Sequence, residues 1–458
     1  MSTLTLSLKL FALLVTFLIS IGTSTPSLAE TLEHIFRLAS QNDPQIRVAE
    51  AALKANLEAR NIGKAALLPQ INARATYRDI QTESANSQFA NDTQTVIYNA
   101  SLRQALFDLP SWYNFKSGSA SANQAEADFL TAKQDLVIRT TQAYLNVLAA
   151  ADTLLTRRSE SAALKSQLEQ AQKRYDVGLI AVTDVLDAQA AYDDVSARLV
   201  EAQGSVSISF ESLGLLTGQV HQSVAPLIAS FPIVEPVPND VDSWVKLAIS
   251  NSSALKSSTL ARDSAHYNSK SRASEHLPTL SLDLGYTDTR PTGELSAFQF
   301  DTQAETAVLS LNVPIFSGGL VSAQRRQAYY QFKQAEDNLE NTQRSVTQNT
   351  RSLYISTITT MATARARQQA IISSKSALEA TRAGHQVGTR NLVDVLAAER
   401  AVFDAELAFS QTRYEYILNM LNLKFTAGVL NANDLMTYNQ YLDTANQIPK
   451  SLLLRASP

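Results

Sequence analysis

Two long stretches of the sequence carry apolar residues at steps of three and four. In the first stretch the positions are Tyr192, Val195, Leu199, Ala202, Val206, Phe210 and Leu213. In the second, with one polar interruption, they are Val402, Ala405, Phe409, Thr412, Tyr416, Met420 and Leu423. This spacing is that of a narrow coiled-coil seam, so we expect long helices in an extended bundle.

Proline placement shows where such helices have room. None stands between Pro110 and Pro226, or between Pro314 and Pro449. A proline inside a helix removes a hydrogen bond and clashes with the preceding turn, so these spans permit long helices. We predict one helix over residues 111–175, about 95 Å long at ~1.5 Å per residue. After a break near Gly178, a second helix runs over residues 184–217.

Four other segments alternate between apolar and polar residues, with charges on the polar face. Their apolar positions are Ile71, Ala73, Ala75 and Tyr77; Val96, Tyr98, Ala100 and Leu102; Leu280, Leu282, Leu284 and Tyr286; and Ala307, Leu309, Leu311, Val313 and Ile315. This alternation over about ten residues is typical of outer-membrane strands, although a two-sided sheet in a soluble protein would also produce it. Polar loops over residues 79–94 and 288–303 would face the exterior, with the helices in the periplasm.

The chain is internally duplicated. Residues 175–188 match residues 385–398, and Gly388 follows Gly178 by 210 residues. Phe316 follows Phe107 by 209 residues. We therefore expect a first repeat over residues 30–218 and a second over residues 241–428. A proline-rich linker, residues 219–240, joins them, and residues 429–458 form a C-terminal segment.

The N-terminus predicts the compartment. Lys9 precedes an apolar run over residues 10–21, and Ser27-Leu28-Ala29 offers small residues at the two positions that a signal peptidase recognises. This pattern predicts a secretory signal peptide over residues 1–29, and an uncleaved anchor is the alternative. The mature chain would begin near Glu30.

Composition removes several classes of chemistry. A net charge of −4 does not point to nucleic acid, and the lack of cysteine excludes disulfides and thiolate metal sites. No later stretch is apolar enough for a membrane helix. The histidines lack zinc-ligand spacing, and no phosphate loop or nucleophile elbow occurs. We expect no enzyme activity, cofactor or metal; the histidines are His34, His221, His266, His276 and His385.

Four strands are too few to close a barrel, because about eight are needed even with a filled interior. An open sheet edge in lipid would leave backbone groups without partners. Several copies must therefore combine, giving eight, twelve or sixteen strands. The polar faces favour a wide, water-filled lumen of twelve strands or more; they carry Arg74, Arg78, Arg103 and Asp283.

These features, in this order and twice along the chain, resemble the TolC family of trimeric outer-membrane efflux proteins. The motifs are GKAALLP at 63–69, QALFD at 104–108, YDVG at 175–178 with TDV at 183–185, HLPTL at 276–280, VPIFSGG at 313–319 and VGTRNLVDVL at 387–396. The resemblance implies an α+β membrane protein, in which a homotrimer forms a twelve-stranded barrel in the outer membrane of a Gram-negative bacterium. A twelve-helix α-barrel would cross the periplasm, with a mixed α/β belt around its middle.

The same resemblance implies a function and partners. The duct would passively carry drugs, toxic compounds or type I secreted proteins to the exterior. A periplasmic adaptor and an inner-membrane pump of the RND or ABC type would supply docking and energy. The residues alone leave two alternatives, a periplasmic adaptor and a soluble secreted coiled-coil protein, neither of which needs four alternating strands.

In this family the helix tips close the duct, and the turns at Gly178 and Gly388 mark them here. The resemblance implies an acidic ring at Asp394, and an arginine, Arg390, that ties neighbouring coils together through Thr183 and Asp184. The alternative role for Asp184 and Asp394 is a favourable charge at a helix N-terminus, worth ~0.3–1 kcal/mol.

The sequence departs from the family pattern at two tip positions. Ala397 stands where a second ring aspartate is expected, and Asp187 in the first repeat could restore some of that charge. His385 replaces a tyrosine of the gating network. His385 could make the gate sensitive to pH near 6–7, or it could be an ordinary solvated loop histidine.

Overall fold

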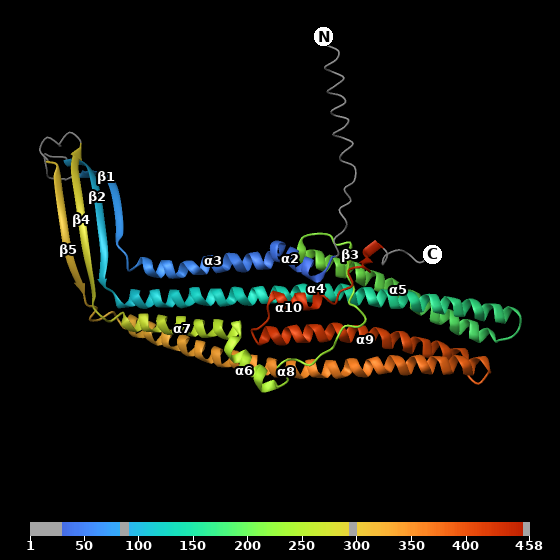
Figure 1. Cartoon of the computed structure of the whole chain (residues 1–458). Helices are drawn as coiled ribbons and strands as arrows, with labels where there is room; N and C mark the ends of the chain where they lie inside the picture. The colour runs from blue at the N-terminus through green and yellow to red at the C-terminus, as the bar shows by residue number, and fades with distance from the viewer. Residues whose placement is uncertain (1–29, 83–90, 293–299, 452–458) are drawn as a thin grey trace, which may run out of the picture.

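The computed structural model describes residues 30–82, 91–292 and 300–451. It shows an elongated, mainly helical α+β protein, with a sheet at one end and two helical hairpin tips at the other (Figure 1). The predicted signal peptide lies outside the described residues, as does the end of the C-terminal segment.

Four long helices form the shaft. α4 (Leu109–Asp176) turns into α5 (Val182–Thr217), and α8 (Leu320–Gln386) turns into α9 (Leu392–Thr426). The predicted helices over 111–175 and 184–217 are thus confirmed to within two residues at each end. In the described ranges, no helix has an apolar stretch long enough to cross a membrane.

Shorter helices extend each hairpin toward the sheet. In the first half these are α2 (Leu32–Asn42) and α3 (Pro44–Ala65), and in the second half α6 (Val241–Asn251) and α7 (Ser253–Ser274). α3 and α7 both lie along α4, on its two sides (Figure 1). Both pairs have matching lengths and stand 209 residues apart, as the duplication predicts.

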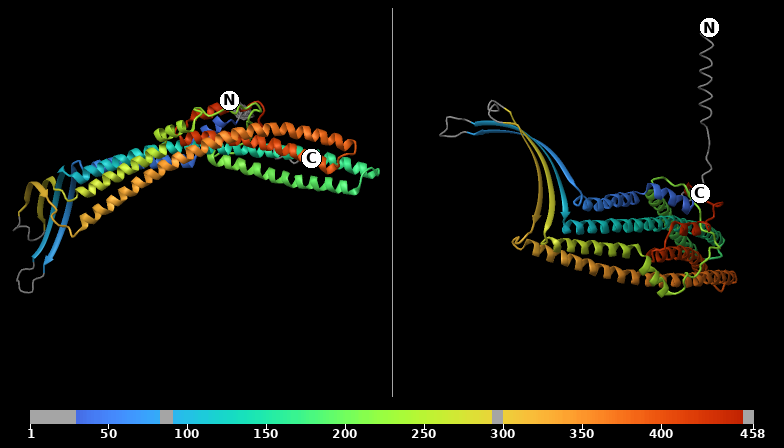
Figure 2. Two further views of the ribbon diagram at one scale, coloured as in Figure 1. Left: turned by 90° about the horizontal axis from the view of Figure 1, so that it is seen from below. Right: turned by 60° about the vertical axis from the view of Figure 1, so that its left-hand side comes forward.

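The sheet contains β1 (Gln70–Thr82), β2 (Asn91–Phe107), β4 (Thr279–Thr292) and β5 (Thr302–Asn312). The spatial order is β1-β2-β4-β5, and each neighbouring pair is antiparallel. Figure 2 shows the strands leaving one end of the helical shaft and curving away from it. β1 and β5 are the edge strands of a single chain.

The observed strand ends correct the sequence prediction in two respects, the length of the loops and the end of β5. The strands continue into the expected loops, so the predicted loops 79–94 and 288–303 are too long; their central residues, 83–90 and 293–299, lie outside the described residues. β5 ends at Asn312, so Val313 and Ile315 are not in a strand. The reason is pairing: Asn312 lies opposite Thr279, the first residue of β4, and no β4 residue remains for position 313.

The register places the apolar positions of all four strands on one face. Ile71 lies opposite Leu102, and Leu102 lies opposite Leu284. The other face is polar, with an Arg103–Asp283 ion pair at 2.8 Å and an Asn99–Thr287 hydrogen bond at 2.9 Å between β2 and β4. The predicted two-faced strands are therefore confirmed.

The main core lies at mid-length, where the linker and the C-terminal segment pack on the long helices. β3 (Ser223–Val224) pairs with β6 (Ile448–Pro449), and α10 (Ala432–Asn439) lies nearby. The Tyr144 hydroxyl donates to the Ala225 carbonyl at 2.7 Å. Burial of large side chains here fixes the base from which both hairpin tips project; these are Tyr144, Leu148, Phe210, Leu213, Ile417 and Leu421.

Candidate gate at the helix tips

Both hairpin tips turn on a glycine in the left-handed region. φ is +73° at Gly178 and +79° at Gly388, where a side chain would strain the backbone. The Gly178 N–H donates to the Tyr175 carbonyl at 2.8 Å, and the Gly388 N–H donates to the His385 carbonyl at 3.1 Å. The two glycines therefore serve the turn geometry that the sequence predicts.

The second tip places Asp394 in a capping box at the start of α9. The Asp394 N–H donates to Asn391 Oδ1 at 2.8 Å, and the Asn391 N–H donates to Asp394 Oδ2 at 3.3 Å. The Arg390 Nη1 atom lies 3.8 Å from the same Oδ2. Asp394 thus lies in the first turn of α9, where the sequence offers a favourable helix N-terminal charge as the alternative role, and 39% of its side chain stays exposed.

His385 connects the second tip to α4. Its Nδ1 lies 3.1 Å from the Arg390 carbonyl, and its Nε2 lies 3.5 Å from Arg174 Nη1. A neutral ring with its proton on Nδ1 donates to the carbonyl and accepts from the guanidinium, so it satisfies both contacts.

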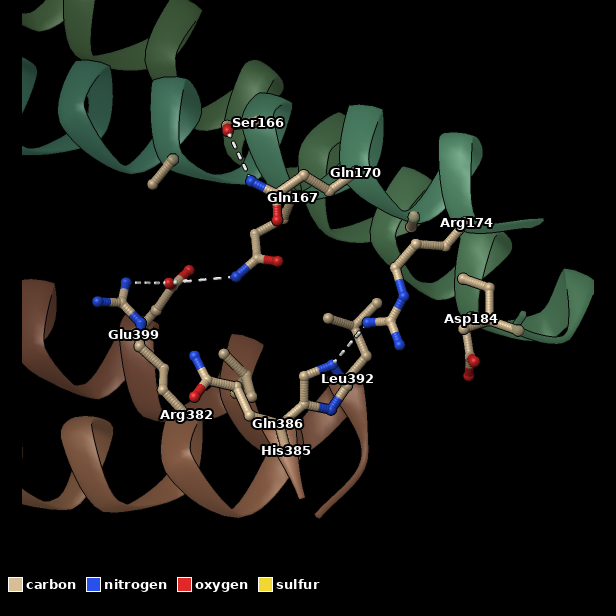
Figure 3. Close-up of a pocket in the computed structure, with 14 residues that line it drawn as sticks. Ser166, Gln167, Gln170, Arg174, Asp184, Arg382, His385, Gln386, Leu392 and Glu399 are labelled. Carbon is tan, nitrogen blue, oxygen red and sulfur yellow. Dashed lines mark hydrogen bonds and ion pairs between the residues drawn. The ribbon is translucent and has the colours of Figure 1, made fainter. Parts of the chain in front are cut away.

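In the described part of the chain, no hydrogen bond or ion pair joins Arg390 to Thr183 or Asp184. Thr183 is exposed, and Asp184 borders a cavity of about 470 Å³ opposite Arg174 and His385 (Figure 3). Within the described residues, the acidic partner of Arg390 is Asp394, in the first turn of the following helix α9. The predicted contact with Thr183 and Asp184 joins neighbouring coils, and it stays a prediction.

Asp187 and Ala397 border one smaller cavity, of about 270 Å³, which is lined by α4, α5 and α9. The two equivalent positions of the repeats therefore lie near each other, and a carboxylate in the first repeat adjoins the site where the second lacks one. Its contribution to the pore charge stays a prediction.

The structure adds a residue that the sequence analysis missed, Glu399. Its side chain is 5% exposed and forms an ion pair with Arg382 of α8. Gln167 of α4 donates to Glu399 Oε1 at 3.4 Å, and the buried Oε2 has no hydrogen-bond partner among the residues that the structure describes. Figure 3 shows these three side chains converging from different helices. The sequence feature that could have identified Glu399 is a charged residue at a seam position, four residues after Val395 and three before Val402.

Further contacts tie α4 to α9 closer to the core. The Tyr414 hydroxyl donates to Asp152 Oδ2 at 2.7 Å, and Arg157 bonds Glu160 at 2.6 Å and reaches Asp404 at 3.3 Å. Burial raises the pKa of the Asp152 carboxyl, and hydrogen bonds from Tyr414 and Ser410 oppose this. Burial also raises the pKa of Tyr414, and the adjacent Asp152 adds to that rise. The two hairpins are thus linked along their length.

The tip chemistry suits ion pairing and charge selection. It offers guanidinium, carboxylate and imidazole groups on exposed helix ends, next to turns that glycine permits. In the described part of the chain, no three His, Asp or Glu side chains are grouped to hold a metal ion.

Comparison with known proteins shows which family has this sequence and this arrangement of helices and strands. The sequence model of the family described as outer membrane efflux protein matches residues 35–219 and again residues 244–429. The chain is 34% identical to outer membrane protein TolC of Vibrio cholerae over 421 residues, which is 92% of this chain and 95% of that protein. It is 28% identical to alkaline protease secretion protein AprF of Pseudomonas aeruginosa, over 87% of this chain and 85% of that protein.

A solved structure shares the fold. The outer membrane protein VceC of Vibrio cholerae aligns with a TM-score of 0.75 at 18% identity, over 87% of this chain and 96% of that one. The predicted resemblance to the TolC family is therefore confirmed by sequence, and the mainly helical α+β fold by structure. The chain belongs to the outer membrane efflux protein family, and it is an outer-membrane exit duct for efflux and type I secretion that extends into the periplasm.

Proposed function

We propose that three copies of the chain close a twelve-stranded barrel that continues into a twelve-helix tunnel. The main observation in support of this proposal is the four-stranded sheet, whose outer edges at β1 and β5 have no partner in the described chain. Such edges cannot stay open in lipid, where each unpaired backbone group costs several kcal/mol.

The two faces of the sheet support a wide barrel. The apolar face suits lipid, and the face with Arg74 and the Arg103–Asp283 pair suits water. A barrel of about eight strands would fill its interior with side chains, whereas twelve strands leave a channel. Drugs, toxic compounds or proteins would pass through it without chemical change, with no enzyme activity and no cofactor.

The division of the chain follows the duplication. We take residues 30–218 and 241–428 as structural repeats, residues 219–240 as their linker and residues 429–458 as the closing segment. Support comes from the matching helices that stand 209 residues apart, α2 with α6 and α3 with α7. Each repeat would supply two strands and one helical hairpin to the trimer.

Partners would supply energy and cargo. The sequence carries no phosphate loop, so the duct needs an inner-membrane pump of the RND or ABC type, together with a periplasmic adaptor. The names of its relatives support both routes: one is an efflux protein, BepC of Brucella suis, and others are protease secretion proteins, AprF and PrtF. Nucleic acid has no part in this function.

The gate would lie at the tips. Three copies of Asp394 around the axis would form an acidic ring, with Asp187 adding charge, and Arg390 would tie each α8–α9 tip to Thr183 and Asp184 of a neighbouring copy. His385 would hold the tip against Arg174. Support comes from the exposed positions of Arg390 and Asp394 beside a glycine turn.

Fractionation and conductance test the proposal. The protein should sediment with the outer membrane, have the mass of three chains in mild detergent, and form a low-conductance pore in planar bilayers. A soluble monomer in the periplasm would contradict the duct and favour an adaptor or a soluble coiled-coil protein.

A further inference from the structure

The β2–β4 junction is where the two halves of the sheet meet inside one chain. β1 and β2 form the hairpin of the first half, and β4 and β5 form the hairpin of the second. β2 and β4 then pair antiparallel across the boundary. In the proposed trimer, on which this inference rests, the same kind of junction recurs between β5 of one copy and β1 of the next.

The two hairpins have an identical register. Gln70 lies opposite Arg103, and Thr279 lies opposite Asn312. Each residue of the second pair follows its counterpart by 209 residues. The β2–β4 register can therefore be transferred to the junction between copies by adding 209 on the β2 side and subtracting 209 on the β4 side.

We propose that β5 pairs with β1 of the next copy in this transferred register. The pair Leu102–Leu284 becomes Leu311 with Ala75 of the partner subunit, and Gln104–Leu282 becomes Val313 with Ala73 of the partner subunit. The pair Ala100–Tyr286 becomes Leu309 with Tyr77 of the partner subunit, and Phe107–Leu280 becomes Phe316 with Ile71 of the partner subunit.

The side chains fit this register. Each of the four transferred pairs named above joins two apolar residues, which is the arrangement that stabilises neighbouring strands. A slip by one residue would turn Arg74 and Arg78 of the partner subunit toward lipid, since a one-residue shift exchanges the faces of a strand. The hydrophobic pattern therefore decides which residues of each strand face lipid. The duplication then decides which residue of β5 lies opposite which residue of β1.

The register also explains why β5 ends early in a single chain. Its counterpart β2 continues to Phe107 because β4 offers residues 280–282 as partners. The equivalent residues of β5 have none, and Ile315 and Phe316 are 94% and 88% exposed, against 53% and 49% for Leu106 and Phe107. In the trimer, residues 313–316 would join the strand.

A proline in this segment suits the same alignment. Pro314 is the counterpart of Ala105, and the β2–β4 ladder is irregular between Ala105 and Phe107. Proline has no N–H to give to a ladder and is tolerated at bulges and edges. Ile315 then takes the place of the bulged residue Leu106.

Cysteine crosslinking tests the register, and the natural chain has no cysteine to interfere. Four double variants use the same four sites. Leu311→Cys with Ala75→Cys, and Val313→Cys with Ala73→Cys, are the matched pairs. Leu311→Cys with Ala73→Cys, and Val313→Cys with Ala75→Cys, are the pairs displaced by two residues. Directly opposite Cα atoms lie about 4.5–5.5 Å apart, within disulfide range, whereas diagonal neighbours lie about 7–8 Å apart.

After mild oxidation of the outer-membrane protein, the matched pairs should give covalent dimers and trimers on denaturing gels. The displaced pairs should crosslink at least about fivefold more slowly, since a disulfide does not span that distance without backbone movement. The mass of each unoxidised variant in detergent is measured alongside. A trimer in which displaced pairs react as fast as matched ones, or in which no pair reacts, overturns the register alone. A monomer that forms no crosslink overturns the proposed trimer itself.

Discussion

The two helix tips of the chain are close copies in backbone and differ in chemistry. Both turn on a glycine with φ between +73° and +79°. In the first tip, Leu179, Ile180 and Ala181 follow the glycine, and α5 begins without a side-chain cap. In the second tip, the equivalent positions carry a threonine, an arginine and an asparagine, and α9 begins with a full capping box.

This difference shows which features the two repeats share and which features differ between them. The turn geometry stays because a left-handed glycine and a short connection are needed to fold each hairpin. In the proposed barrel the side chains are free to diverge, because charge on one tip of each chain is enough to form the acidic ring. We therefore expect the second tip to control ions and the first to act mainly as scaffold, and four experiments probe that contrast.

The largest effect is expected from Asp394→Asn. Asparagine keeps an oxygen for the Asn391 N–H but removes three charges from the axis of the proposed trimer. Block of the current by a trivalent cation of the hexamminecobalt type, added from the periplasmic side, should weaken by roughly tenfold or more. The matched variant Asp184→Asn should change the half-blocking concentration less than about twofold. If the block survives Asp394→Asn but falls with Asp187→Asn, the first repeat carries the ring.

Arg390→Ala should open the gate partly. Exposed ion pairs contribute about 0.2–1 kcal/mol each, so losing three per trimer would raise the open fraction about threefold or more. Single-channel conductance in planar bilayers measures this, and Arg390→Lys, which keeps the charge, should remain closer to the natural protein. Ile180→Ala, at the equivalent first-tip position, shortens an apolar side chain and leaves the charge of the tip unchanged. This variant should not alter how the single-channel conductance depends on salt concentration. Equal conductance for Arg390→Ala and the natural protein would remove Arg390 from the gate.

A pH experiment extends the comparison of the two repeats from the tips to the helical shaft. Asp152 in the first repeat corresponds to Ala362 in the second, so only the first repeat has a carboxyl group at this position. Burial raises the pKa of Asp152, so the folded protein holds this proton more strongly than the unfolded chain. The resulting stability is present at low pH and is lost as the pH rises through the folded pKa. Relative to Asp152→Asn, the natural protein should gain stability as the pH falls from neutrality toward the ordinary pKa of an aspartate, by at most about 1.4 kcal/mol per pH unit. Urea unfolding of both proteins checks this, and parallel pH curves would contradict it.

The smallest effect should come from giving the first tip the missing cap. Ala181 has the extended backbone of a capping residue, with φ −77° and ψ 155°, and Asp184 already stands three residues later. Ala181→Asn should therefore complete a capping box and stabilise the protein by about 0.5–1 kcal/mol. Asn391→Ala should cost a similar amount at the second tip. Urea midpoints that move in the same direction for both variants would show that the two tips do not differ in this respect.

The fold was largely predictable because its signals are local and repeated. Proline-free spans gave the long helices, and period-two alternation gave the strands. The end of β5 was not predictable from alternation, since Val313 and Ile315 continue the pattern while their partner strand stops at Thr279. Whether a residue joins a ladder depends on its neighbour as well as on its own side chain.

The candidate site was predictable in position and less so in contacts. The motif around Gly388 locates Arg390 and Asp394, but only coordinates show that Asp394 caps its own helix. Glu399 escaped notice because a single charge in a long seam resembles an ordinary interruption. Its partners, Gln167 and Arg382, lie 232 and 17 residues away, and no short motif records such a contact.

The unpaired edge of β5 has a kinetic consequence. The helical hairpins join residues close in sequence, so each can form quickly within one chain. In the proposed trimer, closing the sheet is a reaction between chains, and its rate rises with their local concentration. Until closure, Ile315 and Phe316 leave an apolar edge that any extended chain can pair with. During assembly, correct pairing between copies of this chain thus competes with incorrect pairing to other extended chains. Dilution of the protein favours the incorrect pairing.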